Sequence, residues 1–135
     1  MITGKFLAKY LRISIADKKR VSNNTKAESN SIIHQRELIS RYISEKQIGF
    51  FMQTLEFVDD GYSGTNFDRP AVKEMLSLVR ERKIGCIIVQ DLSRFGRNYL
   101  EVGDYLEQIF PFIGVRFIAI NDGYDSDNAI GSTKG

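Results

Sequence analysis

The chain has 135 residues, of which 42% are apolar and 27% charged, and its formal net charge is +2. This length and composition fit one soluble globular domain, and no apolar run is long enough to cross a bilayer. One cysteine and one histidine argue against a disulfide framework and a zinc site. A charge of +2 does not by itself predict a nucleic-acid-binding protein. We see no signal peptide and expect an intracellular, cytoplasmic location.

Strand-like stretches alternate with helix-like stretches along the chain. The apolar spacing predicts strands over 6–15, 54–58 (with a start near Phe50), 84–90 and 115–120, and helices over 28–48, from Pro70 onward, and over 98–110. Ser29 is expected to cap the first helix, and Asn98 with Glu101 to cap the last one. Residues 17–26, 59–66 and 121–135 are polar or turn-like and are expected as loops, while Cys86 is expected as a buried, inert thiol.

Alternating strands and helices indicate an α/β fold. We expect a single domain with a mainly parallel sheet of four to five strands and helices on both faces. In such sheets, ligands bind beyond the carboxyl ends of the strands. The residues at those ends are therefore the first place to look for a functional site.

Hydroxyl groups and arginines follow three of the expected strands. The first strand leads to Arg12, Ser14 and Asp17, the second to Asp59, Asp60, Ser63 and Arg69, and the third to Asp91, Ser93, Arg94 and Arg97. Arginine grips phosphate with paired donors, and the helix expected from Asn98 would add backbone N–H groups. Arginines with a serine and no nearby histidine base suit attack on a phosphodiester, because fixed positive charge can replace a metal.

Each of these residues also has a structural explanation when it is taken alone. Serines at positions 14, 63 and 93 are typical caps or turn residues, and Arg69 can simply be solvated. Arg94 and Arg97 can form surface ion pairs with Asp91 or Glu101, which stabilise little. Their joint placement at one edge of the sheet favours the functional interpretation.

Three motifs in order resemble the catalytic domain of the serine site-specific recombinases, the resolvase–invertase family. They are YLRIS over 10–14, DDGYSGTNFDRP over 59–70 and DLSRFGR over 91–97, and the segments 28–35 and 117–123 also fit. The likeness is strongest to the large recombinases of transposons and phages. It implies a resolvase-like catalytic domain over 1–135, with a loop from about residue 124 and without the family's long dimer helix and DNA-binding domains.

The resemblance implies roles for individual residues. Ser14 would attack DNA and form a 5′-phosphoserine intermediate, after which the strands are rejoined. The remaining catalytic cluster would be Arg12, Ser63, Arg69, Arg94 and Arg97, with Gln35, Asp91 and Ser93 in support. Many small resolvases carry an acid where this chain has Ser93, so the role of that acid is not transferred to Ser93 or Asp91.

The implied partner is DNA, bound by a homodimer and a synaptic homotetramer of the complete protein, near the nucleoid. No metal and no other cofactor is implied. Two other functions remain open from the residues alone: a phosphoacceptor signalling module, since Asp59 and Asp60 follow a strand, and a non-catalytic oligomerisation domain. A serine hydrolase is disfavoured because the chain has no nucleophile-elbow pattern.

Overall fold

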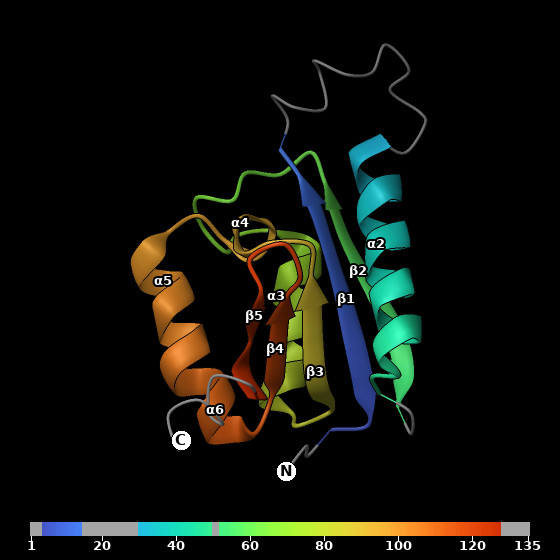
Figure 1. The fold of residues 1–135 in the computed structure, drawn as a ribbon. Coiled ribbons are helices and arrows are strands. Elements are labelled where there is room, and N and C mark those ends of the chain that lie inside the picture. The colour runs from blue at the N-terminus through green and yellow to red at the C-terminus, as the bar shows by residue number, and fades with distance from the viewer. Residues whose placement is uncertain (1–3, 15–29, 50–51, 128–135) are drawn as a thin grey trace.

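A five-stranded sheet runs through the centre of the domain (Figure 1). The computed structural model describes residues 4–14, 30–49 and 52–127. The strand order is β2-β1-β3-β4-β5, with β1 to β4 parallel and β5 antiparallel to β4. The strands are β1 (Phe6–Ile13), β2 (Gln53–Asp60), β3 (Ile84–Val89), β4 (Arg116–Ala119) and β5 (Tyr124–Asp125). The prediction of a mainly parallel α/β sheet is confirmed.

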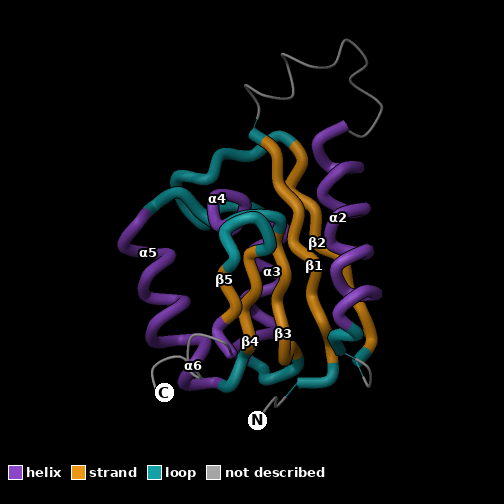
Figure 2. The backbone as a smooth tube through the Cα atoms, viewed as in Figure 1, coloured by secondary structure: helices purple, strands orange, loops and turns teal. Residues whose placement is uncertain are grey.

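Helices cover both faces of this sheet. Successive side chains of a strand point to opposite faces, so Leu7 and Leu11 of β1 pack in one apolar cluster and Ala8 and Tyr10 in another. Helix α2 (Asn30–Lys46) adds its apolar stripe to the first cluster, and α3 (Pro70–Arg80) adds its stripe to the second. Figure 2 shows the helices on the two sides of the strands. Within the described ranges, no helix is long and apolar enough to cross a bilayer.

Strand β1 extends beyond β3 at the carboxyl edge of the sheet. Lys9 is the last β1 residue paired with β3, whereas pairing with β2 continues to Ile13. The backbone of Arg12 therefore has no strand partner on its β3 side. Because buried backbone groups need hydrogen-bond partners, other elements have to supply them, and these elements build the site described below.

Two short elements were not predicted. Helix α4 (Leu92–Phe95) lies between the strand expected to end at residue 90 and the helix expected from Asn98, and β5 lies in the expected loop from about 121. Both are too short for a periodic pattern, and contacts with distant residues hold them. Arg116 donates two hydrogen bonds to Asp125, at 3.0 and 2.7 Å, across β4 and β5.

The helix predicted over 98–110 is present in a modified form. Asn98 caps it as predicted, by accepting the N–H groups of Leu100 and Glu101. Helix α5 (Tyr99–Asp104) passes into a π-helical turn (Tyr105–Ile109) and then α6 (Phe110–Ile113), which contains Pro111. Proline cannot donate a helical hydrogen bond, and the widened turn lies directly before it.

The other boundaries are close to those predicted. Strand β1 ends at Ile13 rather than residue 15, β2 begins at Gln53 and continues to Asp60, and β3 and β4 are each shorter than the apolar runs that predicted them. Helix α2 is observed from Asn30 to Lys46, and α3 begins at Pro70 as predicted. The predictions for Ile15, Asp17, Ser29, Phe50 and the loop 17–26 lie outside the described residues.

Candidate active site at the carboxyl edge of the sheet

Three segments that are far apart in the sequence meet beyond the carboxyl ends of β1, β2 and β3. They are the end of β1, the loop between β2 and α3, and the turn from Asp91 to Arg97 (Figure 1). The backbone N–H of Arg97 donates to the carbonyl of Gly64 at 2.6 Å, which joins the second segment to the third. Most of the predicted site residues thus lie on segments that are bonded to one another.

Arg12 is completely buried, and its guanidinium bonds to backbone rather than to an acid. Nε donates to the carbonyl of Arg94 at 3.0 Å, Nη1 to that of Tyr62 at 2.9 Å, and Nη2 to that of Ser93 at 2.6 Å. These bonds clamp the 91–97 turn and the β2–α3 loop to the end of β1. Carbonyl oxygens satisfy the donors but carry no formal charge, so the positive charge of Arg12 is not cancelled.

The surroundings of Arg12 alter its acidity. Burial lowers the pKa of the Arg12 guanidinium to about 10, and the positive charges of Arg69, Arg97 and Arg94 act in the same direction. Both effects disfavour the charged form. A pKa of about 10 still leaves Arg12 protonated at neutral pH.

Arg69 is buried in the same way, 1% exposed, and belongs to a hydrogen-bonded chain. Its Nη2 donates to the carbonyl of Phe95 at 2.6 Å and its Nη1 to the hydroxyl of Tyr10 at 2.7 Å. The Tyr10 hydroxyl donates in turn to Asp59 Oδ2 at 2.6 Å. Asp59 also accepts the N–H groups of Ala71 and Val72, at 2.8 and 3.0 Å, and so caps α3 from the neighbouring strand.

Burial raises the pKa of the Tyr10 hydroxyl well above its usual range. Arg69 opposes this shift, and the hydrogen bond to Asp59 adds to it. Tyr10 therefore remains a protonated donor, and the chain from Arg69 through Tyr10 to Asp59 ties the 91–97 turn to the start of α3.

Gln35 of α2 supplies the hydrogen-bond partners that the backbone of Arg12 lacks on its β3 side. Its Oε1 accepts the backbone N–H of Arg12 at 3.1 Å, and its Nε2 donates to the carbonyl of Arg12 at 2.9 Å. This buried amide takes the place of a neighbouring strand residue. It holds the backbone of β1 two residues before Ser14.

Arg94 and Arg97 are less buried than Arg12 and Arg69. Arg94 Nη1 donates to the carbonyl of Arg12 at 3.1 Å, the same carbonyl that Gln35 binds. The side chain of Arg94 is 19% exposed, and Arg97 is exposed. These two arginines therefore present positive charge closer to solvent than Arg12 and Arg69 do.

The two serines of the predicted cluster differ in setting. Ser14 is half-buried directly after β1, two residues from Arg12. Ser63 is exposed, and its hydroxyl accepts the N–H of Thr65 at 3.1 Å and lies 2.9 Å from the hydroxyl of Thr65. The side chain of Ser63 thus takes part in its own turn, while the loop that carries it packs on Arg12 through Tyr62 and Gly64.

The sequence model of the family described as "Resolvase, N terminal domain" matches residues 8–133 of this chain. The chain belongs to the resolvase N-terminal domain family. The matched range contains all three motifs on which the resemblance was based, and that prediction is confirmed.

Solved structures share the resolvase fold with this chain. The N-terminal catalytic domain of TP901-1 integrase aligns with a TM-score of 0.74 at 22% identity, over 96% of this chain and 88% of that one. A resolvase family site-specific recombinase from Streptococcus pneumoniae aligns with a TM-score of 0.65 at 22% identity, over 96% and 87%. The C-terminal catalytic domain of ISC1926 TnpA, an IS607-like serine recombinase, aligns with a TM-score of 0.61 at 22% identity, over 84% and 69%.

The helix start near Asn98 bears on another expectation about this resolvase-family site. The helix beginning near Asn98 was expected to offer backbone N–H groups to an anion. The Asn98 side chain already accepts those of Leu100 and Glu101, at 3.1 and 3.2 Å. Two of the N–H groups at this helix start therefore already have an acceptor.

The sequence analysis gave no site role to Tyr10, and it named Asp59 only as a residue at a strand end and as a phosphoacceptor candidate. Strand alternation places Tyr10 on the same face of β1 as Arg12, and this was a usable signal. The bond from Tyr10 to Asp59 had no such signal, because it depends on the register between β1 and β2. Among the described residues, no group of three or more His, Cys, Asp or Glu side chains is arranged to hold a metal ion.

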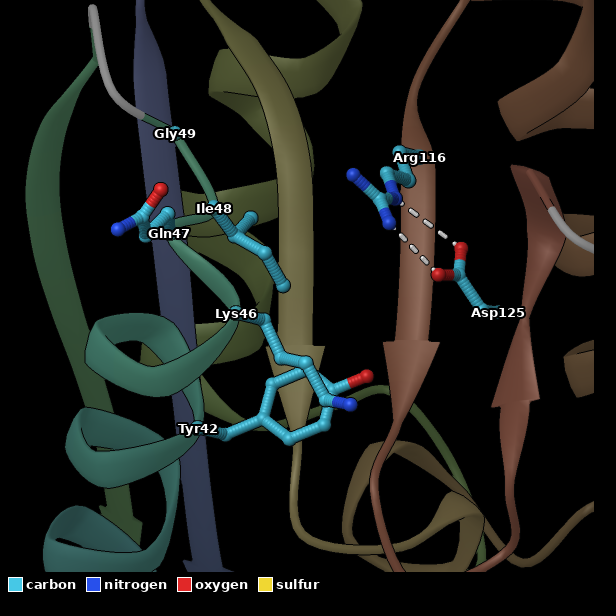
Figure 3. A pocket seen from close by; sticks show the side chains of 7 residues that line it. All are labelled: Tyr42, Lys46, Gln47, Ile48, Gly49, Arg116 and Asp125. Carbon is cyan, nitrogen blue, oxygen red and sulfur yellow. Dashed lines mark hydrogen bonds and ion pairs between the residues drawn. The ribbon is translucent and has the colours of Figure 1, made fainter.

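A hollow of about 300 Å³ lies away from this site, between the end of α2 and the start of β4 (Figure 3). Tyr42 and Lys46 line it from α2, and Arg116 and Asp125 line it from β4 and β5. Arg116 is paired with Asp125 there, and Asp127 lies 3.4 Å from Arg116. The positive charge of Arg116 is therefore cancelled by carboxylates.

Proposed function

We propose that this chain is the catalytic domain of a serine recombinase that cleaves and rejoins DNA strands at specific sites. The observation that carries the proposal is the shared carbonyl of Arg12. It accepts Arg94 Nη1 at 3.1 Å and lies two residues before Ser14 in β1. A candidate nucleophile and a candidate phosphate-binding arginine thus both lie at the end of β1: Ser14 follows it in the chain, and Arg94 is hydrogen-bonded to it.

In the proposed reaction, Ser14 Oγ attacks the phosphorus of a DNA phosphodiester. The bond from phosphorus to the 3′ oxygen breaks, and a 5′-phosphoserine forms. Ser14 loses its proton and the leaving 3′ oxygen gains one, so the step is balanced. The phosphoserine conserves the energy of the diester, and attack by a 3′ hydroxyl of another strand rejoins the DNA without a cofactor.

The arginines have distinct parts in this proposal. Arg94 and Arg97 neutralise the non-bridging and leaving oxygens, because they lie nearest to solvent. Arg12 and Arg69 hold the turn that carries them, and the charge of Arg12, which is bound to carbonyls, adds to the positive potential. One donor aimed at developing charge is worth roughly 3–4 kcal/mol in other enzymes, so two such arginines supply a substantial part of the barrier reduction.

The whole protein would act on cellular DNA in the cytoplasm as a dimer that pairs into a synaptic tetramer, with strand exchange by subunit rotation. The phosphoacceptor alternative is disfavoured by the position of Asp59. Its two oxygens accept Tyr10 O–H and two backbone N–H groups, and the residue is completely buried. A phosphoacceptor carboxylate has to be reached by a phosphodonor.

The test is to incubate the full-length protein with its junction DNA and to look for a covalent protein–DNA band under denaturing conditions. We expect Ser14→Ala to abolish the band. Ser40→Ala, on the exposed side of α2, is the matched control and should retain it. A covalent band of undiminished intensity with Ser14→Ala contradicts the assignment of the nucleophile.

A further inference from the structure

The carboxylate of Asp91 does not make the contacts that its place in the chain predicts. Asp91 directly precedes α4 and has the extended backbone of a helix-capping residue, with φ −153° and ψ 167°. An aspartate at such a position usually accepts a backbone N–H from the first turn. Here the Asp91 side chain accepts none, and a different acid, Asp122 in the turn after β4, accepts the N–H of Leu92 through its Oδ2 at 2.6 Å.

Asp91 faces Ser93 and Arg94 instead. Its Oδ1 accepts the hydroxyl of Ser93 at 2.5 Å, and its Oδ2 lies 3.7 Å from Arg94 Nε. The two acids thus have different partners. Asp122 caps the short helix, which leaves both oxygens of Asp91 to side chains.

Within the described part of the chain, the guanidinium of Arg94 is hydrogen-bonded through Nη1 but not through Nε. Its Nη1 donates to the carbonyl of Arg12 at 3.1 Å, while its Nε is buried and has no hydrogen bond among the described residues. A separation of 3.7 Å from Asp91 is an ion pair but exceeds the roughly 2.7–2.9 Å of a charge-assisted hydrogen bond. A buried donor without a partner is unfavourable, so a small rotation of either side chain that joins Nε to Oδ2 lowers the free energy.

We infer that Asp91 and Ser93 are positioning residues for Arg94. The Ser93 hydroxyl fixes the rotation of the Asp91 carboxylate so that Oδ2 faces Nε. When DNA binds, the pair closes and turns the Nη edge of the guanidinium toward the scissile phosphate. The guanidinium of arginine is planar and rigid, so a hydrogen bond at Nε also fixes the direction of the two Nη groups. The inference rests on the proposed function, because it takes Arg94 to contact that phosphate.

The experiment measures single-turnover cleavage by the full-length protein on junction DNA, together with DNA affinity. Asp91→Asn keeps the size of the side chain and an acceptor for Ser93 but removes the charge. We expect its cleavage rate to fall about 10- to 100-fold, as for small misplacements of catalytic groups, with DNA affinity unchanged. Ser93→Ala should lower the cleavage rate less than Asp91→Asn does. Asp91→Glu, which keeps the charge, should cleave at a rate between those of Asp91→Asn and wild type.

A double-mutant cycle with Arg94→Lys separates positioning from a general structural role. Lysine has no Nε–H within a planar fork. If Asp91 acts through Arg94, then Asp91→Asn has little further effect in the Arg94→Lys background. Asp122→Asn is the matched control, since it removes an equal charge from the other acid beside α4 but leaves an oxygen for the N–H of Leu92. We expect it to cleave within about threefold of wild type.

The outcomes separate this inference from the proposed function. If the wild-type protein forms no Ser14-dependent adduct, the proposed function fails and this inference fails with it. If that adduct forms but Asp91→Asn cleaves at the wild-type rate, only the positioning role is overturned. It is also overturned if the effects of Asp91→Asn and Arg94→Lys multiply fully, or if Asp122→Asn slows cleavage as much as Asp91→Asn.

Discussion

Arg12 and Arg116 lie in opposite regions of the molecule and show how the partner of an arginine decides what its charge can do. At the carboxyl edge, Arg12 donates to three backbone carbonyls. At the amino end of β4, Arg116 donates to the carboxylate of Asp125. Their pKa values move in opposite directions. Burial lowers the pKa of Arg12, whereas the hydrogen bond to Asp125 raises that of Arg116.

The difference explains how a chain with a net charge of only +2 can present an anion-binding edge. Backbone carbonyls hold the guanidinium of Arg12 without neutralising it, and the hydroxyl of Tyr10 separates Arg69 from the carboxylate of Asp59. Arg94 and Arg97 lie closer to solvent, where Asp91 is 3.7 Å from Arg94 Nε. Carboxylates neutralise Arg116 at the other end. The local choice of partners, rather than the net charge, therefore concentrates positive potential beyond the strands.

Replacing a buried arginine of the carboxyl edge should have the largest effect on stability. Arg69→Met leaves the buried carbonyl of Phe95 and the hydroxyl of Tyr10 without their donor, and we expect the free energy of unfolding to fall by about 3–5 kcal/mol. Urea denaturation measures it. Arg97→Met, the same change at an exposed position, should alter it by less than about 0.5 kcal/mol. Equal losses in the two variants would show that burial does not distinguish these arginines.

Gly64 tests how closely the β2–α3 loop packs on Arg12. A Cβ at this position would lie 2.7 Å from Arg12 Nη2 and 2.8 Å from Cζ. Because three carbonyls hold that guanidinium, we expect Gly64→Ala to lower the free energy of unfolding by about 2 kcal/mol. Gly103→Ala is the control, since a Cβ there meets nothing within 4 Å and alanine favours a helix by up to about 1 kcal/mol. A neutral Gly64→Ala in thermal unfolding would mean that the Arg12 side chain can move.

At the opposite region, the prediction concerns pH. Burial alone would raise the pKa of Asp125, but the hydrogen bonds from Arg116 and the backbone of Asp127 outweigh it, so the pKa lies below its usual range. A carboxyl group with a lowered pKa stabilises the fold above its unfolded-state pKa of about 4 and loses this contribution as the pH falls through the folded value. We expect Asp125→Asn to lower the free energy of unfolding by about 1–2 kcal/mol at pH 7.

The difference in the free energy of unfolding between wild type and Asp125→Asn should be constant from about pH 5 to 7 and shrink below about pH 4. Thermal unfolding across this range measures it. Glu81→Gln is a suitable control, because both Glu81 and its ion-pair partner Lys83 are exposed. Exposed ion pairs contribute little to the free energy of unfolding. A gap that persists unchanged at pH 2 would contradict the role of the Asp125 charge.

Much of the fold could be predicted because local pattern determines it. The apolar runs of β3 and β4, the spacing of α3 and the position of Pro70 all gave elements close to those observed. Helix α4 and β5 could not be predicted in this way. Helix α4 has four residues and β5 has two, so neither is long enough to repeat a pattern. Contacts with Asp122 and the pair of Arg116 with Asp125 stabilise them.

By itself, the sequence determined which segments meet. Parallel strands bring their carboxyl ends to one edge, and the three motifs therefore had to converge there. Only the tertiary structure decided what each side chain does at that edge. The partners of the Arg12 guanidinium lie 50 to 82 residues further along the chain. Their spacing in the chain cannot tell whether an arginine will bind a carbonyl, a carboxylate or a phosphate, because register and packing bring those groups within hydrogen-bonding distance.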